Sequence, residues 1–110
     1  MAETALEEFI KRQKERNPIA TKILHKIHKA LKEAGDPITS VYDGEEVTPA
    51  RTRKEVDLLV FNLDQCYLNT ESGGWVRFVP ENEWDSIVDY TLRLETALAP
   101  VNAYIEKYED

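Results

Sequence analysis

Two histidines one helical turn apart are the first residues in this sequence that could do chemistry. His25 and His28 have the spacing that metal sites use when one helix supplies two ligands. Four lysines surround the pair, namely Lys22, Lys26, Lys29 and Lys32. A site for a cation does not recruit four ammonium groups, and no third ligand stands at a fixed offset. We therefore expect no metal and no other cofactor, and a histidine pair that is solvated or lies at the boundary of the core.

The remaining nucleophiles and acids show no catalytic arrangement. Cys66 is the only cysteine, no histidine is placed beside it, and its strand position predicts a small buried hydrophobe. Acid–base catalysis needs two carboxyl groups in different environments within a cleft, and the carboxylates form no such pair. Gly73-Gly74 is isolated and suits a hairpin turn better than a phosphate-binding loop. The sequence thus predicts a protein that is not an enzyme.

Charge is distributed unevenly along the chain, and this pattern indicates binding. Residues 11–32 carry eight Lys or Arg and one Glu, whereas residues 81–110 carry eight acids and two bases. The net charge of −7 argues against general binding of nucleic acid or of an anionic membrane by the whole molecule. We expect another protein to bind the acidic arm, through one helix face formed by Glu83, Trp84, Asp85, Asp89 and Glu95.

Two other functions remain open at this stage. The chain could contact nucleic acid through a basic face on helix 18–34, although that face has no aromatic residue for stacking on bases. Its members are Lys22, His25, Lys26, Lys29 and Lys32. Alternatively, the chain could assemble into homodimers or larger scaffolds through an apolar heptad seam in its last third.

Helical periodicity dominates the first third of the chain. A helix from about residue 5 to 16 would begin with a Thr4–Glu7 capping box. Asn17-Pro18 suits the N-cap and first residue of a second helix over 18–34, while one helix kinked at Pro18 is the alternative. The second helix carries an apolar stripe with its lysines on the opposite face, formed by Ile19, Ile23, Leu24, Ile27, Ala30, Leu31 and Ala34.

Two hairpins are predicted in the middle of the chain. Residues 38–42 and 45–48 would pair through a two-residue type I′ turn at Asp43-Gly44. Residues 66–69 and 75–79 alternate in the same way and would pair through Glu71-Ser-Gly-Gly. Within the second hairpin we expect Trp75 to face the core, and we favour a core position for Trp84 as well.

The two remaining segments are predicted to be helical. Residues 55–63 have the composition of a strand, but a Thr52–Glu55 capping box and helical spacing favour a short helix. In the last third, apolar residues recur at intervals of four and three, which predicts a long helix that kinks or splits near Leu98 because of Pro100. This seam comprises Ile87, Thr91, Leu94, Leu98, Val101, Ile105 and Tyr108.

These elements define the expected fold. One domain over residues 1–110 would be α+β, with a small antiparallel sheet of two hairpins flanked by N-terminal helices and a long C-terminal helix, in the order ααββαββα. No apolar run approaches the roughly 18 residues of a membrane span. The first residues lack the layout of a signal peptide, and a single cysteine allows no internal disulfide, so we expect a cytoplasmic protein without membrane contact.

Five short motifs are spread over residues 42–90, namely Tyr42-Asp43-Gly44-Glu45-Glu46, the helix start Thr52 to Glu55, Asp64, Gly74-Trp75-Val76 and Asp89-Tyr90. In these motifs the segment resembles small uncharacterised α+β proteins encoded by phages and prophages. As a class such proteins are compact and non-enzymatic, and some bind and block host machinery, including bacterial defence systems. The resemblance therefore implies an inhibitor that binds a protein, and it assigns no role to an individual residue.

Overall fold

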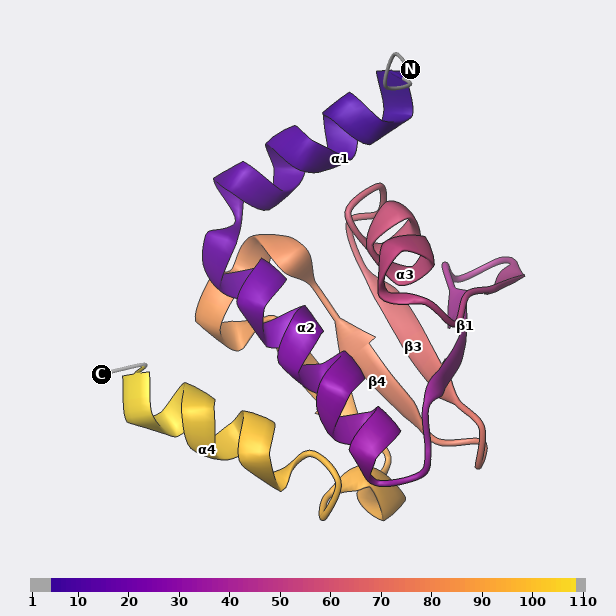
Figure 1. Cartoon of the computed structure of the whole chain (residues 1–110), viewed down its shortest axis with the longest axis vertical. Helices are drawn as coiled ribbons and strands as arrows, with labels where there is room; N and C mark the ends of the chain where they lie inside the picture. Colours follow the sequence, from indigo (N-terminus) through magenta and orange to yellow (C-terminus); the bar gives the residue numbers. More distant parts are fainter. Residues whose placement is uncertain (1–4, 109–110) are drawn as a thin grey trace.

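A computed structural model describes residues 5–108, with helices gathered on one side of an antiparallel sheet (Figure 1). The elements in chain order are α1 (Ala5–Arg16), α2 (Pro18–Glu33), β1 (Ile38–Tyr42), β2 (Val47–Pro49), α3 (Arg53–Val60), β3 (Cys66–Thr70), β4 (Trp75–Phe78), the 3-10 helix η1 (Pro80–Asp85), β5 (Ile87–Tyr90), the 3-10 helix η2 (Leu92–Leu94) and α4 (Ala99–Tyr108). The expected α+β class and the broad order of helices and strands are confirmed.

The sheet has five strands in the order β2-β1-β3-β4-β5, and every neighbouring pair is antiparallel. Leu68 at its centre pairs with Val41 on one side and with Val76 on the other. Because side chains alternate along a strand, these residues share one face, and all three are buried. Figure 1 shows α2 and α3 in front of this sheet, on the side where the core lies.

Helix α2 supplies the largest part of the core. Ile23, Leu24, Ile27 and Leu31 are fully buried, which confirms the predicted apolar stripe. Asn17 occupies the N-cap position, as expected, but its side-chain amide donates to the Gln13 carbonyl instead of accepting a cap bond. Helices α1 and α2 are two separate helices joined through Asn17, and Pro18 is the first residue of α2.

The two predicted capping boxes and the first hairpin have different outcomes. The Thr52–Glu55 box is confirmed: the Thr52 hydroxyl accepts from the Glu55 N–H at 3.2 Å, and a Glu55 carboxylate oxygen accepts from the Thr52 N–H at 3.0 Å. Thr4, which would begin the other box, lies outside the described residues. The two-residue turn at Asp43-Gly44 is wrong, because Tyr42 pairs with Val47 and residues 43–46 form the loop.

The Asp43 carboxylate explains this longer loop. One of its oxygens accepts from the N–H groups of Glu45 and Glu46, both at 2.7 Å. An Asp side chain that bonds its own backbone two and three residues on stabilises a wider turn than the two-residue one.

The predicted helix over the last third is wrong for residues 87–98. Ile87 and Tyr90 instead pair with Phe78 and Val76, so this segment gains strand hydrogen bonds at the free edge of β4. Three residues of the predicted heptad seam are nevertheless buried in the core, although no continuous helix carries them, namely Leu94, Leu98 and Val101. Pro100 falls in the first turn of α4, where a missing N–H costs no hydrogen bond.

The tight turn between β3 and β4 gives a testable consequence for stability. A Cβ atom at Gly74 would lie 2.9 Å from Leu94 Cγ and 3.0 Å from Thr91 Oγ1, so Gly74→Ala forces a well-packed neighbour to move. We expect urea denaturation to show a free energy of unfolding lower by about 1–3 kcal/mol. In a Leu94→Ala background the same substitution should cost clearly less, and an equal cost in both backgrounds would contradict the proposed clash.

Candidate functional site

Two of the five residues expected to bind a partner, Glu83 and Trp84, instead make contacts inside the domain. Glu83 Oε2 accepts from the Ala20 N–H at 2.9 Å, so this carboxylate caps the N-terminus of α2 from a distant part of the chain. The Glu83 backbone has a φ of 49°, a conformation that L-residues adopt only at a cost. Trp84 packs against the core and against Tyr104, with ring centroids 5.8 Å apart. The core position favoured for Trp84 is thereby confirmed.

The three remaining predicted binding residues, all acidic, lie on different elements, and only Asp85 shares η1 with Glu83 and Trp84. Asp85 ends η1, Asp89 lies on β5, and Glu95 lies in the turn between η2 and α4. All three are exposed. The single acidic helix face expected from the sequence is therefore wrong, because the segment that would carry it is a strand between two short 3-10 helices.

The predicted basic face is divided among several contacts. Lys26 Nζ lies 4.3 Å from the centroid of the Tyr104 ring, and Lys29 Nζ lies 3.9 Å from a Glu33 carboxylate oxygen. His25 contacts α3 and is only partly exposed. The two remaining members, Lys22 and Lys32, are exposed.

A buried carboxylate joins the first three helices. Asp57 on α3 is only 4 % exposed, and its Oδ2 lies 2.5 Å from Lys14 Nζ on α1 and 2.9 Å from His25 Nε2 on α2. Its other oxygen, Oδ1, is buried and has no hydrogen-bond partner among the described residues. A buried acid contacted by two bases fastens α1 to the rest of the domain, and it is a structural ion-pair cluster.

His28 gives the domain a pH dependence in mildly acidic solution. Burial lowers its pKa, the charges of Lys32 and Arg53 act in the same direction, and Asp57 opposes them. As the pH falls below about 6.5, the unfolded chain therefore takes up a proton at this position before the folded chain does. We expect the free energy of unfolding to fall as the pH drops from about 6.5 toward 5.

Chemical denaturation across this pH range measures the effect of His28. The variant His28→Gln should show a flatter dependence than the wild type between about pH 5 and 6.5. Stability that is lost through carboxylates such as Asp36, whose pKa is lowered by hydrogen bonds from Ser72 and Thr70, belongs to more acidic solution. An unchanged slope in His28→Gln would contradict the assignment.

Within the described part of the chain, the candidate metal ligands do not cluster and the candidate nucleophile Cys66 is buried. Among residues 5–108, no group of three or more His, Cys, Asp or Glu side chains comes together in a way that could hold a metal ion. Burial raises the pKa of the Cys66 thiol to about 12, so its reactive thiolate form is scarce at neutral pH.

No helix in the described part of the chain has both the length and the apolar character that crossing a membrane requires.

The side of the sheet away from the helices carries a second set of side chains, which we call the open face. Its members alternate with the buried residues of the central strands, and they are Ser40, Tyr42, Tyr67, Asn69, Trp75 and Arg77. All six are partly exposed, and none of them packs against the hydrophobic core. Trp75 therefore does not face the core as expected, because the alternation of β4 assigns the core to Val76 and Phe78.

Three aromatic rings cross the open face as a contiguous row. The ring centroids of Tyr42 and Tyr67 are 5.8 Å apart, and those of Tyr67 and Trp75 are 5.4 Å apart in an edge-to-face arrangement. Aromatic pairs at these separations are mutually attractive, so the row is held in place before anything binds it. Rings of this size on an uncovered sheet provide a large apolar area at a low entropic cost.

Hydrogen bonds fix the polar side chains around the rings. Asn69 Nδ2 donates to the Ser40 hydroxyl at 3.1 Å, and Arg77 Nη2 donates to Gln65 Oε1 at 2.6 Å. Arg77 Nε keeps one N–H with no acceptor among the described residues. Because this nitrogen is buried, it is not offered to a partner on the surface.

Acidic side chains border the open face on two sides. Asp43, Glu45 and Glu46 are exposed in the β1–β2 loop beside Tyr42, and a hollow of about 290 Å³ lies between this loop and Tyr67. On the opposite side, Asp89 is exposed on β5, where its backbone lies opposite that of Arg77 on β4. The four carboxylates outnumber the single cation of the open face, so this surface attracts positive charge.

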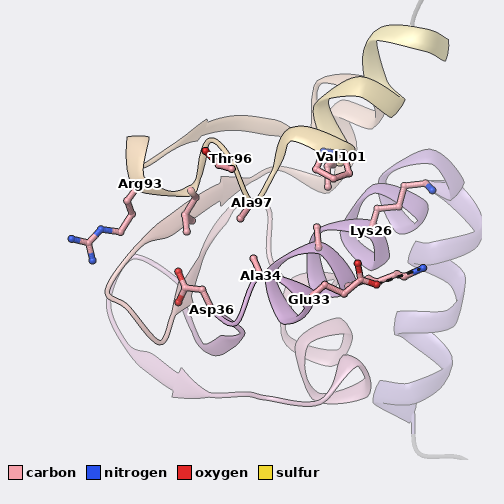
Figure 2. Close-up of a pocket in the computed structure, with 12 residues that line it drawn as sticks. Lys26, Glu33, Ala34, Asp36, Arg93, Thr96, Ala97 and Val101 are labelled. Carbon is pink, nitrogen blue, oxygen red and sulfur yellow. Dashed lines mark ion pairs between the residues drawn. The ribbon is translucent and has the colours of Figure 1, made fainter.

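A separate groove of about 640 Å³ lies on the helical side of the molecule, between α2 and residues 93–101 (Figure 2). We call it the α2–α4 groove. Its lining combines small apolar side chains with charged ones, namely Lys26, Lys29, Ala30, Glu33, Ala34, Asp36, Arg93, Leu94, Thr96, Ala97, Pro100 and Val101.

Comparison with known proteins adds no relative. No protein-family model matches the chain, and neither a curated protein nor a solved structure is significantly similar to it. The function must therefore be argued from the surfaces themselves.

Sequence reasoning missed the open face, although its signal is present. In Cys66–Thr70 and Trp75–Phe78 every second residue is partly exposed, and these residues are aromatic, amide or guanidinium side chains. A solvent-facing strand position normally holds smaller or more hydrophilic residues than tyrosine and tryptophan. That mismatch between position and residue type could have identified the surface.

Proposed function

We propose that this chain is a non-enzymatic protein-binding domain that presents its open face to a basic surface of its partner. The observation that carries the proposal is the row Tyr42–Tyr67–Trp75, which lies in contact across three strands and outside the core. Tyrosine and tryptophan are the residues that contribute most often to binding energy in protein interfaces.

The charges around the row support a basic partner. A surface bearing Lys or Arg would approach the carboxylates of Asp43, Glu46 and Asp89 favourably, while the rings would bury its apolar centre. The inhibitor role implied by the phage resemblance would follow if the basic surface of the target contains its functional site, because the bound domain would then block that site.

The same rings raise one competing function. Aromatic side chains on a sheet also stack on the bases of single-stranded nucleic acid. Such sites combine the rings with a positively charged groove, whereas Arg77 is the only cation among the six residues of the open face, and the neighbouring carboxylates repel phosphate. We therefore favour a protein partner, and an oligonucleotide titration separates the two functions.

Site-specific photocrosslinking tests the proposal. The photoreactive residue p-benzoylphenylalanine replaces Tyr67 in one variant, and in a matched control it replaces Tyr108, which is 51 % exposed on α4. In bacterial lysate we expect one adduct of fixed mass from position 67 only, competed away by unlabelled wild-type protein and weakened by salt. No adduct at position 67, the same adduct at both positions, or tight binding of single-stranded oligonucleotides would overturn the proposal.

A further inference from the structure

The α2–α4 groove exists because small residues stand where two helical segments approach each other. Ala30 on α2 and Ala34, the C-cap residue of that helix, line one side of the groove, and Ala97 faces them from the turn before α4. Figure 2 shows Ala34 at the end of α2, and Ala97 and Val101 on the opposite side of the groove. Leu94 and Val101, each 1 % exposed, complete an apolar floor with these three alanines.

The charged residues of the groove differ in how far they are already neutralised. Asp36 accepts from the Ser72 N–H at 2.8 Å and from the Ser72 hydroxyl at 2.6 Å, which directs its carboxylate to the β3–β4 turn. Glu33 lies beside Lys29 at 3.9 Å. The acids on the rim are thus engaged with groups of the protein itself.

Arg93 Nη1 donates to the Ser72 carbonyl, and among the cations of the groove Lys26 is the one with neither an ion pair nor a hydrogen bond within residues 5–108. Its ammonium group lies 4.3 Å from the Tyr104 ring centroid and forms no ion pair with an acid of residues 5–108. Figure 2 shows Lys26 at one end of the groove and Arg93 at the other. An aromatic ring orients the ammonium without cancelling its charge, which leaves a fixed positive charge beside an apolar channel.

We propose that the α2–α4 groove binds an aliphatic carboxylate, with the acyl chain on the alanine-lined floor and the carboxylate at Lys26. The volume of about 640 Å³ lies within the range of small-molecule sites, which combine an apolar lining with a few placed polar groups. An anion is selected because the unpaired charge at the rim is positive. The inference is independent of the proposed function, since the groove lies on the helical side of the sheet and the open face lies on the other side.

Titration with two probes of equal chain length and opposite charge tests this inference. Decanoate, below its micelle concentration, should displace the anionic dye 1-anilinonaphthalene-8-sulfonate. Decylamine should bind with an affinity lower by about tenfold or more, because it lacks the one charge-assisted contact with Lys26. The variant Lys26→Gln should remove this preference by weakening decanoate binding to a similar extent.

Filling the groove provides the second arm of the test. Ala97→Leu and, independently, Ala30→Met place larger side chains on the floor, while Ala103→Leu makes a matched change at an exposed position of α4 outside the groove. Decanoate should bind wild type and Ala103→Leu equally and bind the filled variants at least about tenfold more weakly, with folding of each verified by circular dichroism. Equal binding of decanoate and decylamine, undiminished binding by both filled variants, or no binding by the wild type would overturn the inference.

Discussion

Replacing Tyr67 and Trp75 together by alanine is expected to weaken binding of the partner protein about a hundredfold or more. Both rings are partly exposed and contact each other edge-to-face at 5.4 Å. Central aromatic residues of an interface typically contribute about 2 kcal/mol or more each when truncated. Titration calorimetry with the crosslinked partner, once it is purified, measures the dissociation constant.

The matched control for the double variant is Tyr108→Ala. Tyr108 is also an exposed aromatic residue, but it lies on α4 and contacts Trp84 and Tyr104. Its replacement should leave the dissociation constant unchanged within about twofold, since only interface residues carry the binding energy. The open-face variant should remain folded, because neither ring packs against the core. Equal losses for both variants would place the interface elsewhere.

Asp57→Ala is expected to lower the free energy of unfolding by about 2–3 kcal/mol, which is a large part of the stability of a small domain. The substitution leaves Lys14 and His25, which contact the carboxylate at 2.5 and 2.9 Å, without their acidic partner. It also removes the charged contact that joins α1 to α3. Urea denaturation at neutral pH measures the change.

Two further variants separate this cluster from a general effect of removing an acid. Asp64→Ala removes an exposed carboxylate and should change the stability by less than about 0.5 kcal/mol. Lys14→Met should destabilise the wild type but cost little more in the Asp57→Ala background, because the two residues share one interaction. Additive losses in the double variant would show that Lys14 and Asp57 do not stabilise the fold through each other.

The parts of the fold that sequence reasoning predicted are those set by local interactions. The stripe of α2, the capping box at Thr52 and Glu55, and the β3–β4 hairpin each depend on residues within a few positions of one another. Local periodicity therefore carries enough information to define them.

The parts that sequence reasoning missed depend on distant residues. Ile87–Tyr90 becomes a strand because β4 offers a free edge, and no feature of those four residues reveals that edge. Likewise Asp57 is buried because Lys14 and His25 reach it from 43 and 32 positions away, and its own neighbours are apolar residues of a short helix. The single acidic helix face was wrong for the same reason, since Glu83 caps α2 and Asp89 lies on a strand.

The two tryptophans allow a direct measurement of which surface meets the partner, because one lies on the open face and the other in the segment first expected to bind. In Trp84→Phe the only indole is Trp75, and in Trp75→Phe the only indole is Trp84. Acrylamide quenching of each variant, with and without saturating partner, reports the solvent access of each ring. If the open face is the binding surface, the partner will lower the quenching of Trp75 several-fold and leave that of Trp84 unchanged. Protection of Trp84 with no change at Trp75 would contradict the proposal.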